Sequence, residues 1–400
     1  MPSQNFELPA GTSILPSSTQ DMRSDEEISA SLVNPPAEVT SQKNIWAFWD
    51  KGFNQLHGWQ KRNVIGWVRK LGPSWTVRVL DYVEGSPTNL LKYVDASNLP
   101  EAILNRSMTG AHSGQHVSDL VRLPLLYQYG GIYLDIGVML LGDIEESLWK
   151  KIEDPQSDYR IGGFAHEHRQ NSWGSMQNFC IAAQKGEEII QRWHRVMLEV
   201  WQGRSSSQGL VRHPIFDGVP AEPNPRVLMS INPGTEELLL DYWVNLLAWE
   251  KLKVTVDDAS GFNGPEYVRK HVLLLEPMQE AFAADVYIRL NTLRLFRMLI
   301  CPRDITVEGL DPVLHSEAKA LVDYLLTSST VMKLYHGHGY MLAPPLATFW
   351  EVLGNEDADV RRGTFGEYLR YAGEMIDQQR KVQPLSLAVY DGPIVRGRLP

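Results

Sequence analysis

The sequence predicts an α/β protein with a mixed, mainly parallel sheet and helices on both of its faces. Two observations indicate this class. Over the first hundred residues, candidate strands alternate with candidate helices, which is typical of parallel strands joined by helical crossovers. Later, the stretch GGIYLDIGVMLL at 130–141 is apolar on both faces, as a central strand covered on both sides should be.

The first four elements follow from local signals. NIWAFWD predicts an aromatic strand at 44–50, and WTVRVLD predicts a second strand at 75–81. Between them, apolar residues near helical spacing predict a helix at 57–72, which a Gly-Pro pair ends. A second helix is expected at 86–96, because its opening Ser-Pro pair suits an N-cap and a first helical turn.

The remaining elements follow the same rules. The helix at 118–131 contains Pro124, which should kink it or mark a restart. Its terminal glycine pair leads into the apolar strand at 130–141. Further elements are expected as strands at 160–165, 178–184 and 271–277 and as helices at 186–204, 235–252, 312–326 and 364–381.

Domain organisation follows from composition along the chain. Residues 1–42 are polar and rich in Ser, Pro and Glu, so we expect a flexible extension that can hold a short helix at 24–33. After residue 42 the sequence has no internal repeat and no clean linker. Residues 43–400 are therefore expected to form one domain with helical additions.

Composition excludes several classes of partner. The net charge of −10 argues against a nucleic-acid backbone as the main partner. Cys180 and Cys301 are the two cysteines, so no disulfide framework is expected and a reducing compartment fits. The N-terminus lacks the basic start and apolar core of a signal peptide, and no apolar run reaches about 18 residues. We expect a cytoplasmic protein with no membrane span.

One acid interrupts the apolar strand at 130–141. Asp135 is followed by Ile136 and Gly137, and ligands in open α/β sheets bind beyond the carboxyl ends of the strands. Asp135 is therefore a candidate for contact with a ligand or a metal ion. Capping of the next turn by the same carboxylate explains the pattern equally well.

The preceding helix carries a second pair of charges. Asp119 and Arg122 are three residues apart, so they share one helix face. A surface ion pair would contribute under about 1 kcal/mol, but the leucines around this pair indicate a place near the interior edge. There the guanidinium offers a planar fork of donors to a phosphate or a sugar hydroxyl, and the carboxylate offers acceptors.

The stretch SDLVRLPLLYQYGGIYLDIGVMLL at 118–141 resembles the signature of glycosyltransferases of the capsular-polysaccharide-synthesis type. It is similar also to the sugar-binding region of the yeast outer-chain mannosyltransferases and the large clostridial glucosylating toxins. The shared pattern is S-D-x-x-R, an apolar helix, and Y-G-G-[IV]-[YW]-x-D. Weaker similarity covers NIWAFWDKG at 44–52, NFCIAAQKGEEIIQRWH at 178–194 and KLYHG at 333–337.

The resemblance implies a GT-A-like fold, a Rossmann-like α/β domain that binds a nucleotide-sugar. It implies transfer of a sugar from a UDP- or GDP-linked donor, with retention of anomeric configuration. The absence of a signal or anchor favours a small molecule, a lipid-linked molecule or a cytosolic protein as the acceptor over a Golgi glycan.

The resemblance also implies roles for single residues. Asp119, Arg122 and Asp135 match the catalytic signature. Asp119 would hold donor hydroxyls, Arg122 the sugar or diphosphate, and Asp135 the ribose or a metal-bound water. The other residues implied in donor binding are Trp46, Phe48 and Trp49, with an aromatic against the nucleobase, and Asn178 in the donor-sugar pocket.

The sequence departs from the family at one position. Most such enzymes carry Asp-x-Asp, and the last acid binds a divalent cation, whereas this chain has Gly137 there. A diphosphate leaving group needs neutralisation, usually by Mg²⁺ or Mn²⁺ with oxygen ligands. The expected metal ligands are Asp135 and His336, which lies in the late HGHGY turn. Asp143 is a further candidate ligand in place of the missing acid. Lys333 would be the cation if no metal binds.

Gly137 keeps several interpretations open. It either lets the backbone approach the ligand closely or replaces a lost metal ligand. Two other functions also remain: a repurposed GT-A-fold enzyme of secondary metabolism with non-glycosyl chemistry, and an inactive nucleotide-sugar-binding protein. The presence together of Asp119, Arg122 and Asp135 favours an active enzyme, because a dead site has no physical need for three charges beside apolar walls. HEHR at 166–169 is a weak metal motif, and Asp241 fits a core helix better than an acceptor site.

Overall fold

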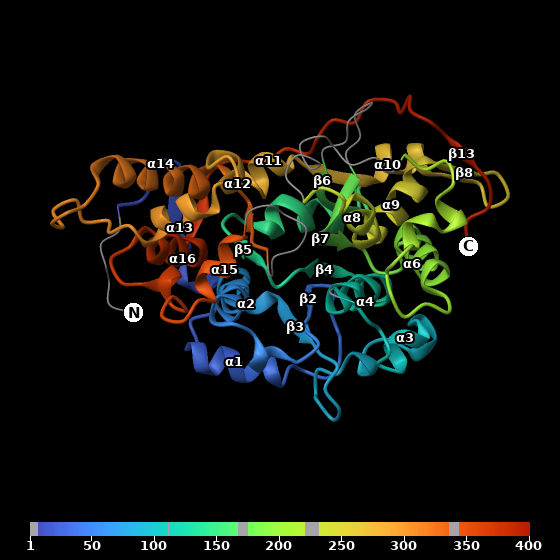
Figure 1. Ribbon diagram of the computed structural model, residues 1–400, viewed down its shortest axis with the longest axis horizontal. Coiled ribbons are helices and arrows are strands. Elements are labelled where there is room, and N and C mark those ends of the chain that lie inside the picture. Colours follow the sequence, from blue (N-terminus) through green and yellow to red (C-terminus); the bar gives the residue numbers. More distant parts are fainter. Residues whose placement is uncertain (1–6, 111, 167–174, 221–231, 336–343) are drawn as a thin grey trace.

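The computed structural model in Figure 1 describes residues 7–110, 112–166, 175–220, 232–335 and 344–400. Its centre is a six-stranded sheet with the order β10-β6-β7-β4-β2-β3. The strands are β2 (Asn44–Phe48), β3 (Thr76–Leu80), β4 (Gly131–Leu134), β6 (Ile161–His166), β7 (Ser175–Ala183) and β10 (Val272–Leu275).

The sheet is mixed and mainly parallel, as predicted. Strand β2 pairs in parallel with β3 and β4, and β10 pairs in parallel with β6. Strand β7 is antiparallel to both of its neighbours, β4 and β6. Five strands therefore point one way, and the start of β7 lies at the edge where the carboxyl ends of the others meet.

Helices cover both faces of the sheet. Neighbouring residues of a strand point to opposite faces, so Ile45 and Trp46 of β2 enter two different hydrophobic cores. Trp46 packs with α4 (Ser113–Tyr129), α6 (Glu188–Trp201) and α9 (Val244–Val254). Ile45 packs with α1 (Asp25–Val33) and α2 (Gly58–Leu71).

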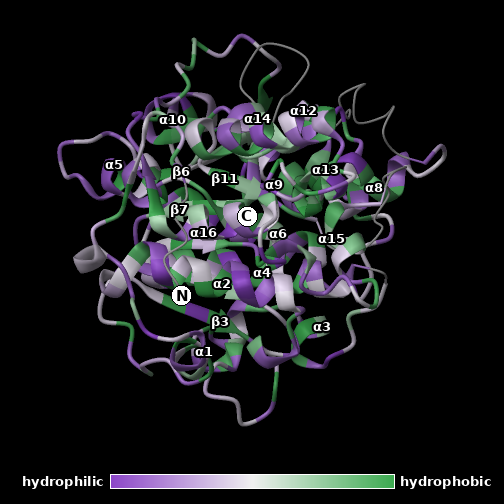
Figure 2. Ribbon diagram, turned by 90° about the vertical axis from the view of Figure 1, so that its left-hand side faces the viewer, coloured by the Kyte–Doolittle hydropathy of each residue, from purple (hydrophilic) through white to green (hydrophobic). Residues whose placement is uncertain are grey.

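A helical unit forms a third core beside the sheet. It consists of α13 (Thr292–Ile300), α14 (Pro312–Ser328), α15 (Leu346–Trp350) and α16 (Phe365–Met375). Its helices pack on a two-stranded sheet of β5 (Val138–Leu140) and β11 (Val331–Lys333). In Figure 2, helices such as α2 and α14 carry both hydrophobic and hydrophilic residues, as helices with one buried face do.

The remaining elements are short. They are the helices α3 (Glu101–Leu104), α5 (Lys150–Glu153), α8 (Glu236–Tyr242), α10 (Gly264–His271), α11 (Pro277–Glu280) and α12 (Ala283–Tyr287), and the strands β1 (Thr12–Ile14), β8 (Thr255–Asp257), β9 (Phe262–Asn263), β12 (Ile376–Gln378) and β13 (Val395–Arg396). Within the described ranges, no helix is long and apolar enough to cross a membrane.

Most predicted elements are confirmed, but some differ. The stretch at 130–141 is two strands, β4 and β5, that belong to different sheets. The helix at 235–252 is broken into α8 and α9 at Trp243. Pro124 marks no restart, since α4 runs through it as one element, and a kink there stays a prediction.

The helix predicted at 86–96 is absent. Ser86 does not cap a helix, because its hydroxyl donates to Asp81 Oδ2 at 2.6 Å. The hydroxyl of Thr88 donates to the same oxygen at 2.6 Å. These bonds fold the segment back onto the end of β3, and only a short 3-10 turn at Leu90–Lys92 follows.

The short helix expected near the N-terminus is present as α1. A capping box between Ser24 and Glu27 begins it, and Ile28 and Leu32 are buried against α2 and β3. Strand β1 pairs with β12, so residues before 42 contact the end of the helical unit. The division into an extension and a single domain stays a prediction.

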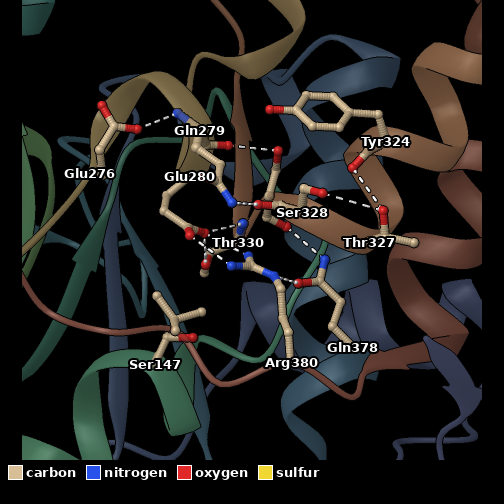
Figure 3. A network of polar contacts seen from close by, with 12 residues as sticks. Ser147, Glu276, Gln279, Glu280, Tyr324, Thr327, Ser328, Thr330, Gln378 and Arg380 are labelled. Carbon is tan, nitrogen blue, oxygen red and sulfur yellow. Dashed lines mark hydrogen bonds and ion pairs between the residues drawn. The ribbon is translucent and has the colours of Figure 1, made fainter.

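A polar network holds the start of β11 (Figure 3). Glu280 accepts hydrogen bonds from the amide of Thr330 at 3.0 Å and from its hydroxyl at 2.6 Å. Arg380 donates to both carboxylate oxygens of Glu280, each at 2.7 Å. Its Nε donates to Gln378, whose amide donates to the carbonyl of Ser329. The C-terminal segment thereby fixes the strand that ends in Lys333.

We expect Glu280→Ala to lower the free energy of unfolding by about 3 kcal/mol, because it leaves the guanidinium of Arg380 and the amide of Thr330 without their buried acceptor. Urea denaturation followed by circular dichroism measures the change. Glu146→Ala is the matched control: it removes an exposed ion pair with Lys150 and should cost under about 1 kcal/mol. Equal losses in the two variants would contradict a structural role for the Glu280 network.

Candidate functional site

The candidate site lies at the edge of the sheet where the parallel strands end. Asp135 directly follows β4, and its amide donates to the carbonyl of Phe179 in β7 at 2.8 Å. Asn178 is the neighbouring residue of the antiparallel strand, so it lies at the same edge. Two of the predicted donor-binding residues are thus placed together by the strand pairing itself.

Helix α4 brings the ion pair to this edge. Arg122 Nη2 lies 2.9 Å from Asp119 Oδ1, and the two side chains are only 3% and 5% exposed. The pair is therefore interior, as the surrounding leucines predict. Arg122 also donates to the hydroxyl of Ser118 at 2.8 Å and to the carbonyl of Asn178, and its guanidinium lies 4.5 Å from the centre of the Tyr133 ring.

Asp135 joins this pair to a second cation. Arg122 Nη2 lies 3.4 Å from Asp135 Oδ1, and Lys333 Nζ lies 3.0 Å from Asp135 Oδ2. Asn178 completes the group, since its side-chain amide donates to Asp119 Oδ1 at 2.8 Å. The structure thus gathers five predicted residues in one charge cluster: Asp119, Arg122, Asp135, Asn178 and Lys333. The Asp135 side chain is 28% exposed, more than those of Arg122 and Lys333.

The two carboxylates of the charge cluster differ electrostatically. Burial raises the pKa of Asp119 to about 7, against the opposing effect of the Arg122 guanidinium. Burial also opposes ionisation of Asp135, but the cations Lys333 and Arg122 outweigh it and hold the Asp135 pKa below its usual range. Asp135 is therefore the permanent negative charge of the site, and Asp119 is the group that titrates near neutrality.

Helix α2 holds the turn that carries Asp135. Asn63 donates to the carbonyl of Ile136 at 2.9 Å, and the indole of Trp67 donates to the carbonyl of Val138 at 2.8 Å. Arg370 of α16 donates to Asn63 Oδ1, so the helical unit supports the same turn. The sequence analysis missed Asn63, although its spacing of four residues from Trp59 and from Trp67 places it on the buried side of the helix.

Gly137 allows a close approach of another part of the backbone. A Cβ at this position would lie 2.3 Å from the carbonyl oxygen of Leu334 and 3.4 Å from Lys333 Nζ. The Gly137 carbonyl also accepts from the amide of Leu334 at 2.7 Å. The glycine is therefore required by the contact between the turn and the residue that follows β11.

The aromatic residues of β2 lie in the interior. Trp46 is fully buried, its ring lies between Tyr93 and Tyr129 at 5.9 and 5.3 Å, and its indole donates to the carbonyl of Gly130 at 2.9 Å. Phe48 is also a core residue. Both rings pack in the core, and the prediction that one aromatic of this stretch lies against the nucleobase stays untested. Trp49 is half-buried beyond the end of β2.

Other predicted residues lie elsewhere or outside the described ranges. His336 belongs to 336–343, which the structure does not describe, and most of HEHR at 166–169 lies in another such range. Asp143 accepts from the amide of Glu146, as a helix cap does. Asp241 accepts from the amides of two residues near 210, so its structural interpretation is confirmed.

A histidine beside the charge cluster was also missed. His116 lies one turn before Asp119 on α4, and its Nδ1 is 3.9 Å from Asp119 Oδ2. Its ring packs on Trp201 and Tyr242 at 5.2 and 5.9 Å. Burial lowers the His116 pKa to about 4, so this side of Asp119 is lined by a neutral imidazole. The i, i+3 spacing from Asp119 is the signal that would have found it.

Comparison with known proteins adds what geometry alone does not give. The family model described as "Capsular polysaccharide synthesis protein" matches residues 19–213. The chain is 38% identical to O-glycosyltransferase braB of Annulohypoxylon truncatum, over 97% of this chain and 92% of that protein. It is 37% identical to glycosyltransferase afumC of Aspergillus fumigatus, over 90% and 92%, and 32% identical to O-glycosyltransferase PaGT of Phomopsis amygdali, over 98% and 96%.

The chain belongs to this family of glycosyltransferases. The family model ends close after α6, whereas the matches to the relatives extend over nearly the whole chain. The divalent cation expected at Asp135 stays a prediction, because His336, its other expected ligand, lies outside the described residues. Outside the undescribed ranges, no group of three His, Cys, Asp or Glu residues is placed to hold a metal ion, and both oxygens of Asp135 already face cations.

The titration of Asp119 predicts a pH dependence of stability. Its native pKa of about 7 lies above the model-peptide value of 3.8, so the native state binds a proton that the unfolded state has lost. The contribution of Asp119 to the free energy of unfolding should therefore fall as the pH rises from 5 to 8. Asp119→Asn removes this titration. The free energy of unfolding of wild type, relative to that of the variant, should therefore decrease as the pH rises from 5 to 8. Urea denaturation at several pH values measures it, and a pH-independent difference would contradict the assignment.

Proposed function

We propose that this glycosyltransferase transfers a sugar from a UDP- or GDP-linked donor to a hydroxyl group of a small molecule, with retention of anomeric configuration. The charge cluster at the carboxyl edge of the sheet is the observation that carries the donor class. The names of two relatives, both O-glycosyltransferases, support an oxygen acceptor. The signature at 118–141 supports retention and a GT-A-like version of the fold, and a cytoplasmic location stays a prediction.

The donor would bind on the side of Asp135 and Lys333. These side chains are 28% and 11% exposed, whereas Arg122 is 3% exposed. Arg122 already donates to protein groups through all three of its nitrogens. We therefore assign direct contact with the donor to Asp135 and Lys333, and we treat Arg122 as a positioning residue that orients both carboxylates.

The chemistry required at this place is charge stabilisation. As the bond between the sugar and the diphosphate breaks, negative charge grows on the leaving oxygen, and preorganised cations lower the barrier most effectively. Lys333 is held by Asp135 before any donor arrives, so little reorganisation is needed. Asp135 would in turn accept a hydrogen bond from a ribose or sugar hydroxyl, because a carboxylate has acceptor sites beyond the one that Lys333 uses.

Calorimetric titration with UDP, GDP and their common sugar conjugates tests the donor class. We expect one nucleotide series to bind, and Asp135→Asn to weaken that binding about tenfold or more, because a charge-assisted bond contributes about 1.5–3 kcal/mol. Asp154→Asn, at an exposed turn aspartate, is the matched control and should bind like wild type. If no nucleotide or conjugate binds, the proposed donor class is wrong.

A further inference from the structure

Lys333 occupies the place next to Asp135 where a bound cation would be needed. Its ammonium lies 3.0 Å from Asp135 Oδ2, while the guanidinium of Arg122 lies 3.4 Å from Oδ1. Each oxygen of the carboxylate therefore faces one positive charge. The two side chains together carry the charge of one divalent ion.

The fold fixes Lys333 in this position. It is the last residue of β11, pairs with Val138 of β5, and donates its amide to the carbonyl of Ala281 at 3.1 Å. Its ammonium lies 5.5 Å from the ring centre of Phe179 and 5.6 Å from that of Tyr335. Aromatic faces attract a cation at these distances. A lysine held by strand pairing, two rings and a carboxylate is preorganised in the way a bound metal ion is.

Gly137 and Lys333 are structurally linked. An acid at position 137 would have its Cβ 2.3 Å from the Leu334 carbonyl oxygen and 3.4 Å from Lys333 Nζ. The second acid of an Asp-x-Asp motif therefore has no room here, and the space next to it already holds an ammonium. A divalent ion at Asp135 would have to displace that ammonium and would be repelled by Arg122 as well.

We propose that Lys333 serves as the built-in cation of this glycosyltransferase, so that the diphosphate of the donor binds and leaves without a divalent metal ion. The inference rests on the proposed donor class and goes beyond it, because it assigns the charge that the missing second acid would otherwise recruit. In this arrangement Lys333 contacts the diphosphate, Arg122 keeps Asp135 in place, and Gly137 makes room for the strand that delivers the lysine.

Calorimetry with UDP and GDP on the full chain tests this directly. With wild-type protein, the dissociation constant of the nucleotide that binds should stay within about twofold when EDTA replaces Mn²⁺. Lys333→Met should weaken that binding about ten- to a hundredfold in either condition, and Lys333→Arg should recover part of it. Lys43→Met is the matched control, since Lys43 is also an ion-paired lysine, with Glu145 and Glu153 as partners, and its loss should leave nucleotide binding unchanged.

The affinity ratio between the diphosphate and the monophosphate separates a charge role from a packing role. If Lys333 contacts the diphosphate, Lys333→Met should weaken the binding of UDP or GDP far more than the binding of UMP or GMP. A merely structural role would weaken both alike and would overturn the proposal. The chelator experiment needs only wild-type protein. It therefore decides whether nucleotide binding requires a divalent metal ion even if Lys333→Met fails to fold.

The outcomes are distinguishable from failure of the proposed function. Nucleotide binding that appears only with Mn²⁺ would overturn the role of Lys333 and leave the donor class standing. Binding of no nucleotide in either condition would overturn the donor class, and the lysine assignment with it. Metal-independent binding that Lys333→Met does not weaken would overturn the lysine assignment alone.

Discussion

The buried guanidinium of Arg122 is the interaction on which the rest of the site depends. Removing such a cation from water costs several kcal/mol, and only well-placed carboxylates and carbonyls offset that cost. Its partners come from α4, from the turn after β4 and from β7. These three elements can satisfy one guanidinium only when α4 packs on the sheet in this register and β4 ends at Asp135. The charge cluster is therefore a condition of the local fold as well as a feature of the site.

The end of β4 sets what surrounds Asp135. After Leu134 the chain leaves the central sheet, and from Val138 it continues as β5, whose partner is β11. The small sheet is what brings Lys333, nearly two hundred residues later in the chain, to within 3.0 Å of Asp135. A single continuous strand across 130–141 would have carried the chain past this point. The close contact between this turn and Leu334, next to the lysine, is possible because residue 137 is a glycine.

Sequence patterns predicted the parts of the site that depend on local spacing. Asp119 and Arg122 follow from helical periodicity, and Asp135 follows from its place at a strand end. The division of 130–141 could not be read, because both strands are buried and the apolar run has no polar interruption except Asp135 itself. Trp46 lies in a core, and an aromatic strand has the same sequence pattern in a core as in a binding surface. No helix forms at 86–96, because the hydroxyl of Ser86 donates to Asp81. The sequence signals for a helix start at Ser86 do not include this contact.

The helical unit is a working part of the site. It packs on the strand that ends in Lys333, and Arg370 of α16 reaches the Asp135 turn through Asn63. Asp359 in turn holds Arg370 at 2.7 Å. Interior side chains are close-packed, so a shift in α16 is transmitted to its contacts and not absorbed by empty space. The position of Asp135, the more exposed carboxylate of the charge cluster, is therefore set both by the central sheet and by the helices of the helical unit.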